Sequence, residues 1–198
     1  MNKWSEIKQA TLDKLFMDED EARQQKYLEK FQACANECLN LIANGVKPRI
    51  VAHKFSVIAD DKPVGIGEYH LGDIITMPDD FLSFADMIVL RNNAPYDDVV
   101  YLGDRDVVVG ELGDYVIYYS GLWELITDDH VDPMKDKPLD IHVSVINCLP
   151  AYIASKVLAQ DDVQRSTILN NEFELALSRL DTNIMYQNNH YRSSGGWY

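Results

Sequence analysis

The residues of this chain that could do metal chemistry lie close together around position 130. Asp128, Asp129, His130 and Asp132 fall within five positions. Carboxylate and imidazole groups can hold a divalent cation, and a cation-bound water could attack a substrate as in a hydrolase. Surface loops are commonly as acidic as this, and we interpret residues 128–132 as such a loop. A metal-dependent hydrolase that uses these four residues stays as an alternative.

Three cysteines and a histidine form a second set of metal-ligand types. Cys34 and Cys38 lie four positions apart, and Cys148 or His142 could join them in a zinc site. Structural zinc sites usually take their cysteines from tight turns, whereas Cys34 and Cys38 occupy helix positions that suit small apolar side chains. We therefore interpret them as core residues. An odd number of cysteines also argues against a disulfide framework and favours a reducing compartment.

Other patterns of catalytic chemistry are missing from the sequence. The run Asp18-Glu19-Asp20-Glu21 is explained by helix capping, because carboxylates stabilise the first turn of a helix. The chain has no Gly-x-Ser-x-Gly elbow, no Gly-x-x-x-x-Gly-Lys phosphate loop and no His-Glu-x-x-His pair. We expect no catalytic residues, no cofactor and no bound metal, so the sequence does not predict an enzyme.

Apolar residues with helical spacing stand at both ends of the chain. In the C-terminal part they predict a helix from Pro138, kinked at Pro150, and a second helix that begins after Asp161 and Asp162. The two stripes consist of Ile141, Val145, Cys148, Leu149, Tyr152 and Ile153, then Ile168 or Leu169, Phe173, Ala176, Leu177 and Leu180. In the N-terminal part, residues 4–16 predict a short helix. Residues 22–43 predict a long one that covers the C-terminal pair.

The period of the apolar pattern changes from 3.6 to 2 between Arg49 and about Ile126. Alternation over residues 51–58 and short runs at 73–77, 87–91, 99–102, 107–109 and 115–119 are separated by turn residues. This spacing is typical of a small antiparallel sheet or barrel. We therefore predict an α+β fold.

The predicted domains follow from these periods. Residues 1–48 and 138–181 should form a helical bundle of about four helices, and residues 49–137 an inserted β-domain. Residues 182–198 lose periodicity and should form an extended C-terminal arm that carries the aromatic residues Tyr186, Tyr191, Trp197 and Tyr198. Large aromatic side chains bury much area for each residue ordered, so we interpret these four as docking residues for a neighbouring subunit or protein.

The net charge of the chain is −14, with a pI near 4.6. Such a surface repels phosphate, which argues against tight nucleic-acid binding. It also suits a surface past which DNA moves without sticking, or a soluble protein of any kind. No apolar run is long enough to span a bilayer and no signal peptide begins the sequence, so we expect synthesis in the cytoplasm.

The order of the predicted parts, and three phrases of the sequence in particular, resemble the head–tail connector (adaptor) proteins of tailed bacteriophages. The phrases are Ile75-Thr76-Met77-Pro78-Asp79-Asp80-Phe81-Leu82, Cys148-Leu149-Pro150-Ala151-Tyr152 with Leu158-Ala159-Gln160-Asp161-Asp162, and the ending Ser193-Ser194-Gly195-Gly196-Trp197-Tyr198. The resemblance covers most of the chain. It implies a structural protein of the virion neck that forms a homo-oligomeric ring, usually a dodecamer, below the portal protein.

In such a ring the helical part would face the portal and the β-domain the next neck or tail protein. DNA would pass through the lumen during genome ejection without sequence-specific binding, and no membrane would be involved. The tail terminators and stoppers of the same neck region are alternatives. From a different class, an acidic protein that binds and inhibits a host factor is a further alternative.

Overall fold

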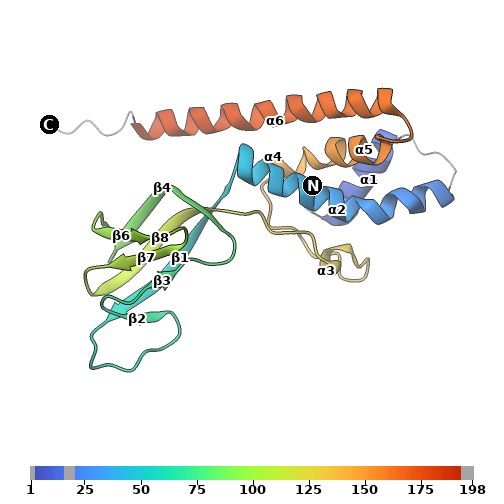
Figure 1. Ribbon diagram of the computed structural model, residues 1–198. Helices are drawn as coiled ribbons and strands as arrows, with labels where there is room; N and C mark the ends of the chain where they lie inside the picture. Colours follow the sequence, from blue (N-terminus) through green and yellow to red (C-terminus); the bar gives the residue numbers. More distant parts are fainter. Residues whose placement is uncertain (1–2, 16–20, 193–198) are drawn as a thin grey trace. The chain divides into compact units, whose positions relative to one another are not determined.

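The computed structural model describes the backbone of residues 3–15 and 21–192, and the side chains of residues 3–15, 25–84 and 88–180. The fold class is α+β, as predicted. The chain divides into two compact units, a helical unit of residues 1–47 and 123–198 and a β-unit of residues 48–122 (Figure 1). The boundary predicted at residue 137 is wrong, because residues 123–137 belong to the helical unit.

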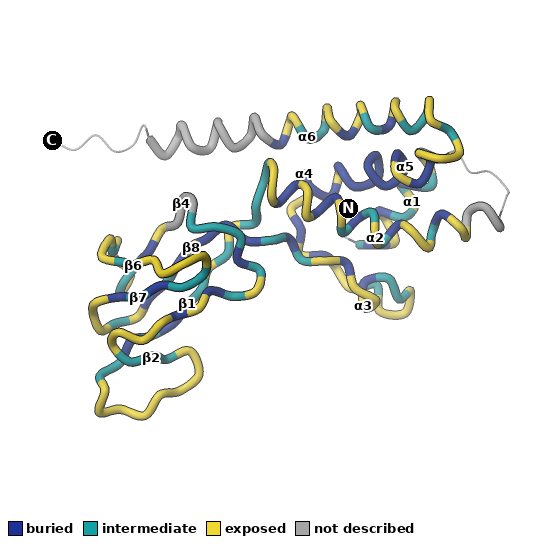
Figure 2. Tube along the Cα trace, in the orientation of Figure 1, coloured by how far each residue is buried: buried dark blue, intermediate teal, exposed yellow. Residues whose placement is uncertain are grey.

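The helical unit is built around α5 (Leu149–Leu158), which is buried on all sides except at Lys156 (Figure 2). A helix that is apolar all round must be covered all round. It contacts α1 (Trp4–Leu15), α2 (Glu21–Gly45) and α6 (Val163–Arg192). Burial of each large aliphatic side chain stabilises such a core by about 1.5–3 kcal/mol. The prediction that residues 22–43 cover the C-terminal helices is thereby confirmed for α5.

The helix predicted from Pro138 begins later and is interrupted. Residues 143–146 form the short α4 (Val143–Ile146), and a separate helix, α5, starts at Leu149. Pro150 therefore lies in the first turn of α5, where its missing N–H has no intrahelical partner to lose. The predicted kink inside one continuous helix is wrong.

Asp162 starts α6, since its carboxylate accepts a hydrogen bond from the backbone N–H of Arg165 at 3.0 Å. Asp161 has a different role and accepts from the hydroxyl of Tyr27 on α2. The buried stripe of α6 follows Leu169, Phe173 and Leu180, while Ile168 is exposed.

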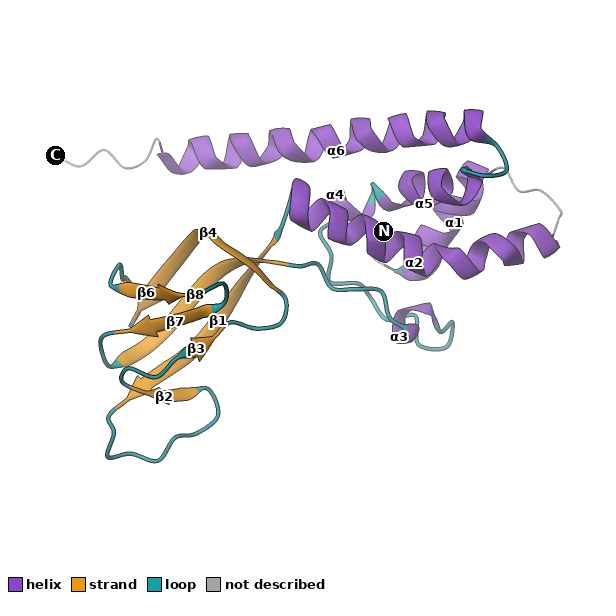
Figure 3. Ribbon diagram, in the orientation of Figure 1, coloured by secondary structure: helices purple, strands orange, loops and turns teal. Residues whose placement is uncertain are grey.

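Two sheets share one core in the β-unit (Figure 3). The order of the five-stranded sheet is β2-β1-β8-β4-β5. Its strands are β1 (Arg49–Ile58), β2 (Glu68–His70), β4 (Phe81–Arg91), β5 (Ala94–Pro95) and β8 (Gly113–Gly121). The β1–β2 pair is parallel and the other pairs are antiparallel, so the predicted antiparallel sheet contains one parallel pair.

The order of the second sheet is β3-β7-β6, and it is antiparallel. Its strands are β3 (Ile75–Thr76), β6 (Val99–Leu102) and β7 (Asp106–Val109). Apolar side chains from both sheets fill the space between them. Phe55 and Tyr115 stack there with ring centroids 5.2 Å apart, and Ile117 and Val107 are fully buried.

Candidate functional site

Four aromatic residues near the end of the sequence are predicted to dock on a neighbour, and the structure describes the backbone of two of them. The backbone around Tyr186 and Tyr191 is helical, because α6 continues to Arg192. The prediction of an extended arm is therefore wrong for residues 182–192. Trp197 and Tyr198 lie outside the described residues, as does the predicted cap at Asp18.

Side chains of the acidic stretch, residues 128–132, form hydrogen bonds with nearby groups of the same segment. Residues 128–131 form the helical turn α3 (Asp128–Val131) instead of the predicted loop. Lys135 donates to Asp129 at 2.7 Å and holds the pKa of that carboxyl below its usual range. Asp132 accepts from the backbone N–H of Met134, and the buried His130 accepts through Nδ1 from the N–H of Thr127. No group of three potential ligands converges in the described part of the chain.

The cysteines occupy core positions. Cys38 and Cys148 are buried and Cys34 is half-buried. Burial raises the pKa of Cys148 to about 11 and that of Cys38 further, so both thiols stay protonated near neutral pH. His142 caps α4 by accepting from the N–H of Ser144. Burial confirms the interpretation of Cys38 as a core residue, whereas Cys34, given the same interpretation, is only half-buried.

The phrase around Pro78 forms a corner that joins three parts of the β-unit. The carbonyl of Met77 accepts from the Arg105 guanidinium at 2.8 Å, and the same group donates to Asp79 at 3.1 Å. Asp80 accepts from the hydroxyl of Tyr119 at 2.7 Å. Its carbonyl accepts from the N–H of Leu122, the last residue of the unit. The phrase on which the resemblance depends is thus an anchoring element of the β-unit.

The outer face of the five-stranded sheet is a candidate docking surface. Strand register brings Ala52, Tyr118 and Ile88 into one row across β1, β8 and β4. Ile88 is 58% exposed, Tyr118 36% and Ile50, on the same side of β1, 65%. We call this set, with Ala52, the outer sheet face. Side chains that point inward from the same strands are buried or half-buried, so alternation along each strand creates this apolar surface.

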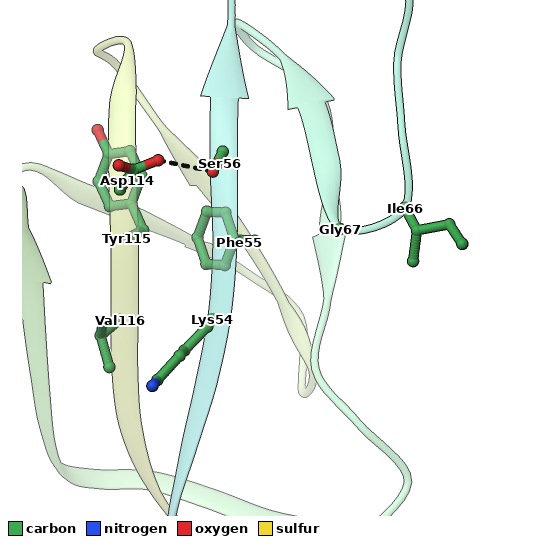
Figure 4. A pocket seen from close by; sticks show the side chains of 8 residues that line it. All are labelled: Lys54, Phe55, Ser56, Ile66, Gly67, Asp114, Tyr115 and Val116. Atoms are coloured by element: carbon green, nitrogen blue, oxygen red, sulfur yellow. Dashed lines mark hydrogen bonds between the residues drawn. The ribbon is translucent and has the colours of Figure 1, made fainter.

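An open hollow of about 350 Å³ lies at one end of β1 and β8 (Figure 4). Its lining consists of Lys54, Phe55, Ser56, Ile66, Gly67, Asp114, Tyr115 and Val116. The Asp114 carboxylate already accepts from the Ser56 hydroxyl at 2.7 Å, and the Ile66 side chain points away from the strands. The hollow therefore shares strands β1 and β8 with the outer sheet face.

A scan against protein-family models finds no family that matches this chain, and a search of curated proteins finds no matching protein. In the described part of the chain, none of the helices has the length and apolar character needed to cross a membrane.

Proposed function

We propose that this protein is a structural adaptor of a tailed-bacteriophage virion, which assembles as a ring below the portal, joins head to tail and lets DNA pass. The observation that carries the proposal is the architecture. Both ends of the chain form the helical unit, and the β-unit is inserted between Lys47 and Trp123. This is the arrangement that the resemblance to head–tail connectors implies. Of the phrases that carry the resemblance, the one around Pro78 forms a corner of the β-unit, and the one within residues 148–162 contains the start of α5 and the turn into α6.

Charge supports the same proposal. A chain of net charge −14 builds a ring whose acidic surface repels the DNA backbone, so DNA could slide through without binding. An acidic inhibitor of a host DNA-binding protein would have the same charge. The two are distinguished by mixing the protein with its portal and, separately, with basic host proteins. Competition with DNA for one host protein, without a portal complex, would favour the inhibitor.

The outer sheet face supports ring formation by contact with a second copy. Lys54 lies beside the apolar row and is exposed, so an acidic neighbouring subunit would be attracted to this face. Closed rings need heterologous contacts, in which one face of a subunit meets a different face of the next. The outer sheet face, an apolar row with Lys54 beside it, would supply one of the two faces of such a contact.

The test of the proposal is assembly on the portal. Purified protein and portal are mixed and studied by electron microscopy and native mass spectrometry. We expect a ring of copies, twelvefold if the resemblance holds, with the helical unit toward the portal. Binding of the protein to the portal without formation of a ring, or no complex at all, would contradict the proposal. A ring that closes the end of the portal against DNA would instead indicate a stopper, and one bound only to the tail tube a terminator.

A substitution on the outer sheet face tests the subunit contact. Ile88→Lys should abolish ring closure because it places a charge in an apolar contact, while folding of the monomer is preserved at an exposed position. Ile74→Lys is the matched control, since Ile74 is an isoleucine of the same unit with the same 58% exposure. Equal ring yield for both variants would remove the outer sheet face from the interface.

A further inference from the structure

Strand β6 is an open edge of the three-stranded sheet. In the described residues it pairs only with β7, and its other side has no strand beside it. Alternate residues of an edge strand direct their N–H and C=O groups away from the sheet, where a further strand can bind them. The sheet is therefore able to accept one more strand at β6.

The side chains of β6 are unusually apolar for an open edge. Val100 is 53% exposed, Tyr101 50% and Leu102 40%. Tyr101 packs against Phe84 with ring centroids 5.0 Å apart, which holds one side of the strand in place. Proteins commonly protect an edge with lysine, proline or a bulge. Within Val99–Leu102 none of these occurs, and the pairing with β7 is regular.

Carboxylates stand at both ends of this edge. Asp97 and Asp98 precede β6, and Asp104 lies in the turn that follows it. All three are exposed. Arg105, the nearest cation after the strand, is engaged with Asp79 and the Met77 carbonyl.

These charges decide which strand can bind. If two copies of β6 paired antiparallel, Asp97 and Asp98 of each would approach Asp104 of the other, and like charges opposite one another destabilise a strand pair. Self-pairing is thereby disfavoured. A strand with apolar residues at alternate positions and lysine or arginine at both ends would satisfy the free backbone groups, the apolar side chains and the carboxylates together.

We propose that β6 binds an extended, apolar segment with basic flanks from a different protein, which adds as a fourth strand to the sheet β3-β7-β6. The proposal concerns the β-unit alone and does not depend on ring formation or on the adaptor function. It defines the partner by its chemistry, an alternating apolar strand between two basic ends.

The probe is a synthetic peptide, Lys-Arg-Thr-Val-Thr-Val-Thr-Val-Lys-Arg, added to the full-length protein. Calorimetry should show saturable binding that weakens as salt is raised, and hydrogen exchange should slow at residues 99–102. Two control peptides separate the contribution of charge from that of backbone hydrogen bonds. In one, glutamate replaces every lysine and arginine; in the other, alternate backbone nitrogens are methylated so that they cannot donate. Both should lose binding.

Charge reversal on the protein tests the role of the flanks. The double variant D97K/D98K should weaken peptide binding by about tenfold or more, because two attractions become repulsions at one end of the strand. The matched control D60K/D61K makes the same change at two exposed, adjacent aspartates in the loop after β1 and should bind as the unchanged protein does.

Four results would overturn the proposal. The first is the absence of any saturable binding by the basic peptide, and the second is equal binding of the acidic or methylated peptide. The third is slowed exchange that lies elsewhere than residues 99–102. The fourth is concentration-dependent self-association that Val100→Lys abolishes, which would assign the edge to a second copy of this chain.

Discussion

Asn36 on α2 holds the chain where it returns from the β-unit to the helical unit. Its amide nitrogen donates to the carbonyl of Ile126 at 3.0 Å, and its amide oxygen accepts from the N–H of the same residue at 2.8 Å. Gln32, one turn earlier, donates to that carbonyl at 3.0 Å. Ile126 is 1% exposed, so water is a poor substitute partner. We predict that Asn36→Ala destabilises the helical unit.

The magnitude follows from the two groups that lose a partner. The Ile126 carbonyl keeps Gln32, but its N–H is left unsatisfied, which costs about 1–3 kcal/mol. Alanine returns about 0.6 kcal/mol because it is a better helix former than asparagine. The expected net loss is about 1.5 kcal/mol, and it should lower Tm by roughly 3–6 °C for a chain of this size.

The assay is urea unfolding followed by tryptophan fluorescence, since Trp4 and Trp123 both belong to the helical unit. Two variants calibrate the result. Gln32→Ala should cost less than Asn36→Ala, because the carbonyl keeps its second donor. Asn40→Ala changes an exposed asparagine of the same helix and should cost nothing. If Asn36→Ala and Asn40→Ala agree within about 0.5 kcal/mol, the two hydrogen bonds do not stabilise the return segment.

Three further predictions concern groups that the structure places in defined contacts. Tyr119→Phe should destabilise the β-unit by about 1.5–3 kcal/mol, measured by urea unfolding, because Asp80 loses a hydrogen-bond donor. Glu37→Gln should lower stability slightly at pH 7, by up to about 0.5 kcal/mol. The Lys156 hydrogen bond holds the pKa of Glu37 below its usual value, so the stabilisation is present above about pH 4.3 and is lost as pH falls through the lowered pKa. Cys148 should resist alkylation at pH 8 in the folded protein, as measured by peptide mass spectrometry, because its raised pKa leaves little thiolate.

Each of these has a matched control. Tyr118→Phe changes the neighbouring, exposed tyrosine of β8 and should be neutral. Glu29→Gln changes an exposed glutamate of α2 and should leave the pH dependence as it is. Cys34, which is half-buried, should be alkylated before Cys148. Equal losses for the two tyrosines, a difference at Glu37 that persists at pH 2, or faster labelling of Cys148 than of Cys34 would contradict the corresponding prediction.

The site was harder to predict from the sequence than the fold. The aromatic C-terminus drew attention because its composition is unusual, but its backbone is helical to Arg192. The alternation of apolar residues along β1 gave a weak indication of the outer sheet face. Nothing in the sequence indicated the roles of Arg105 and Asn36, because each forms hydrogen bonds with backbone groups more than twenty residues away in the chain. A polar residue that bonds to distant backbone looks, in the sequence, like any surface residue.

Periodicity by itself determined the class of the fold. The change from a period of 3.6 to one of 2 near Arg49, and back again in the C-terminal part, predicted helices at both ends and strands between them, because these periods are local properties of helix and strand geometry. It also identified buried side chains such as Val145, Tyr152 and Phe173.

Tertiary structure alone decided where elements begin and which strands meet. Pro150 is compatible with a kinked helix and with a helix start, and the chain takes the start because α4 ends at Ile146 and α5 is buried as a separate helix. The parallel pairing of β2 with β1 and the open edge at β6 depend on which strands the rest of the β-unit brings alongside them. Such pairings are set by how the whole unit fills its core, and no local pattern encodes them.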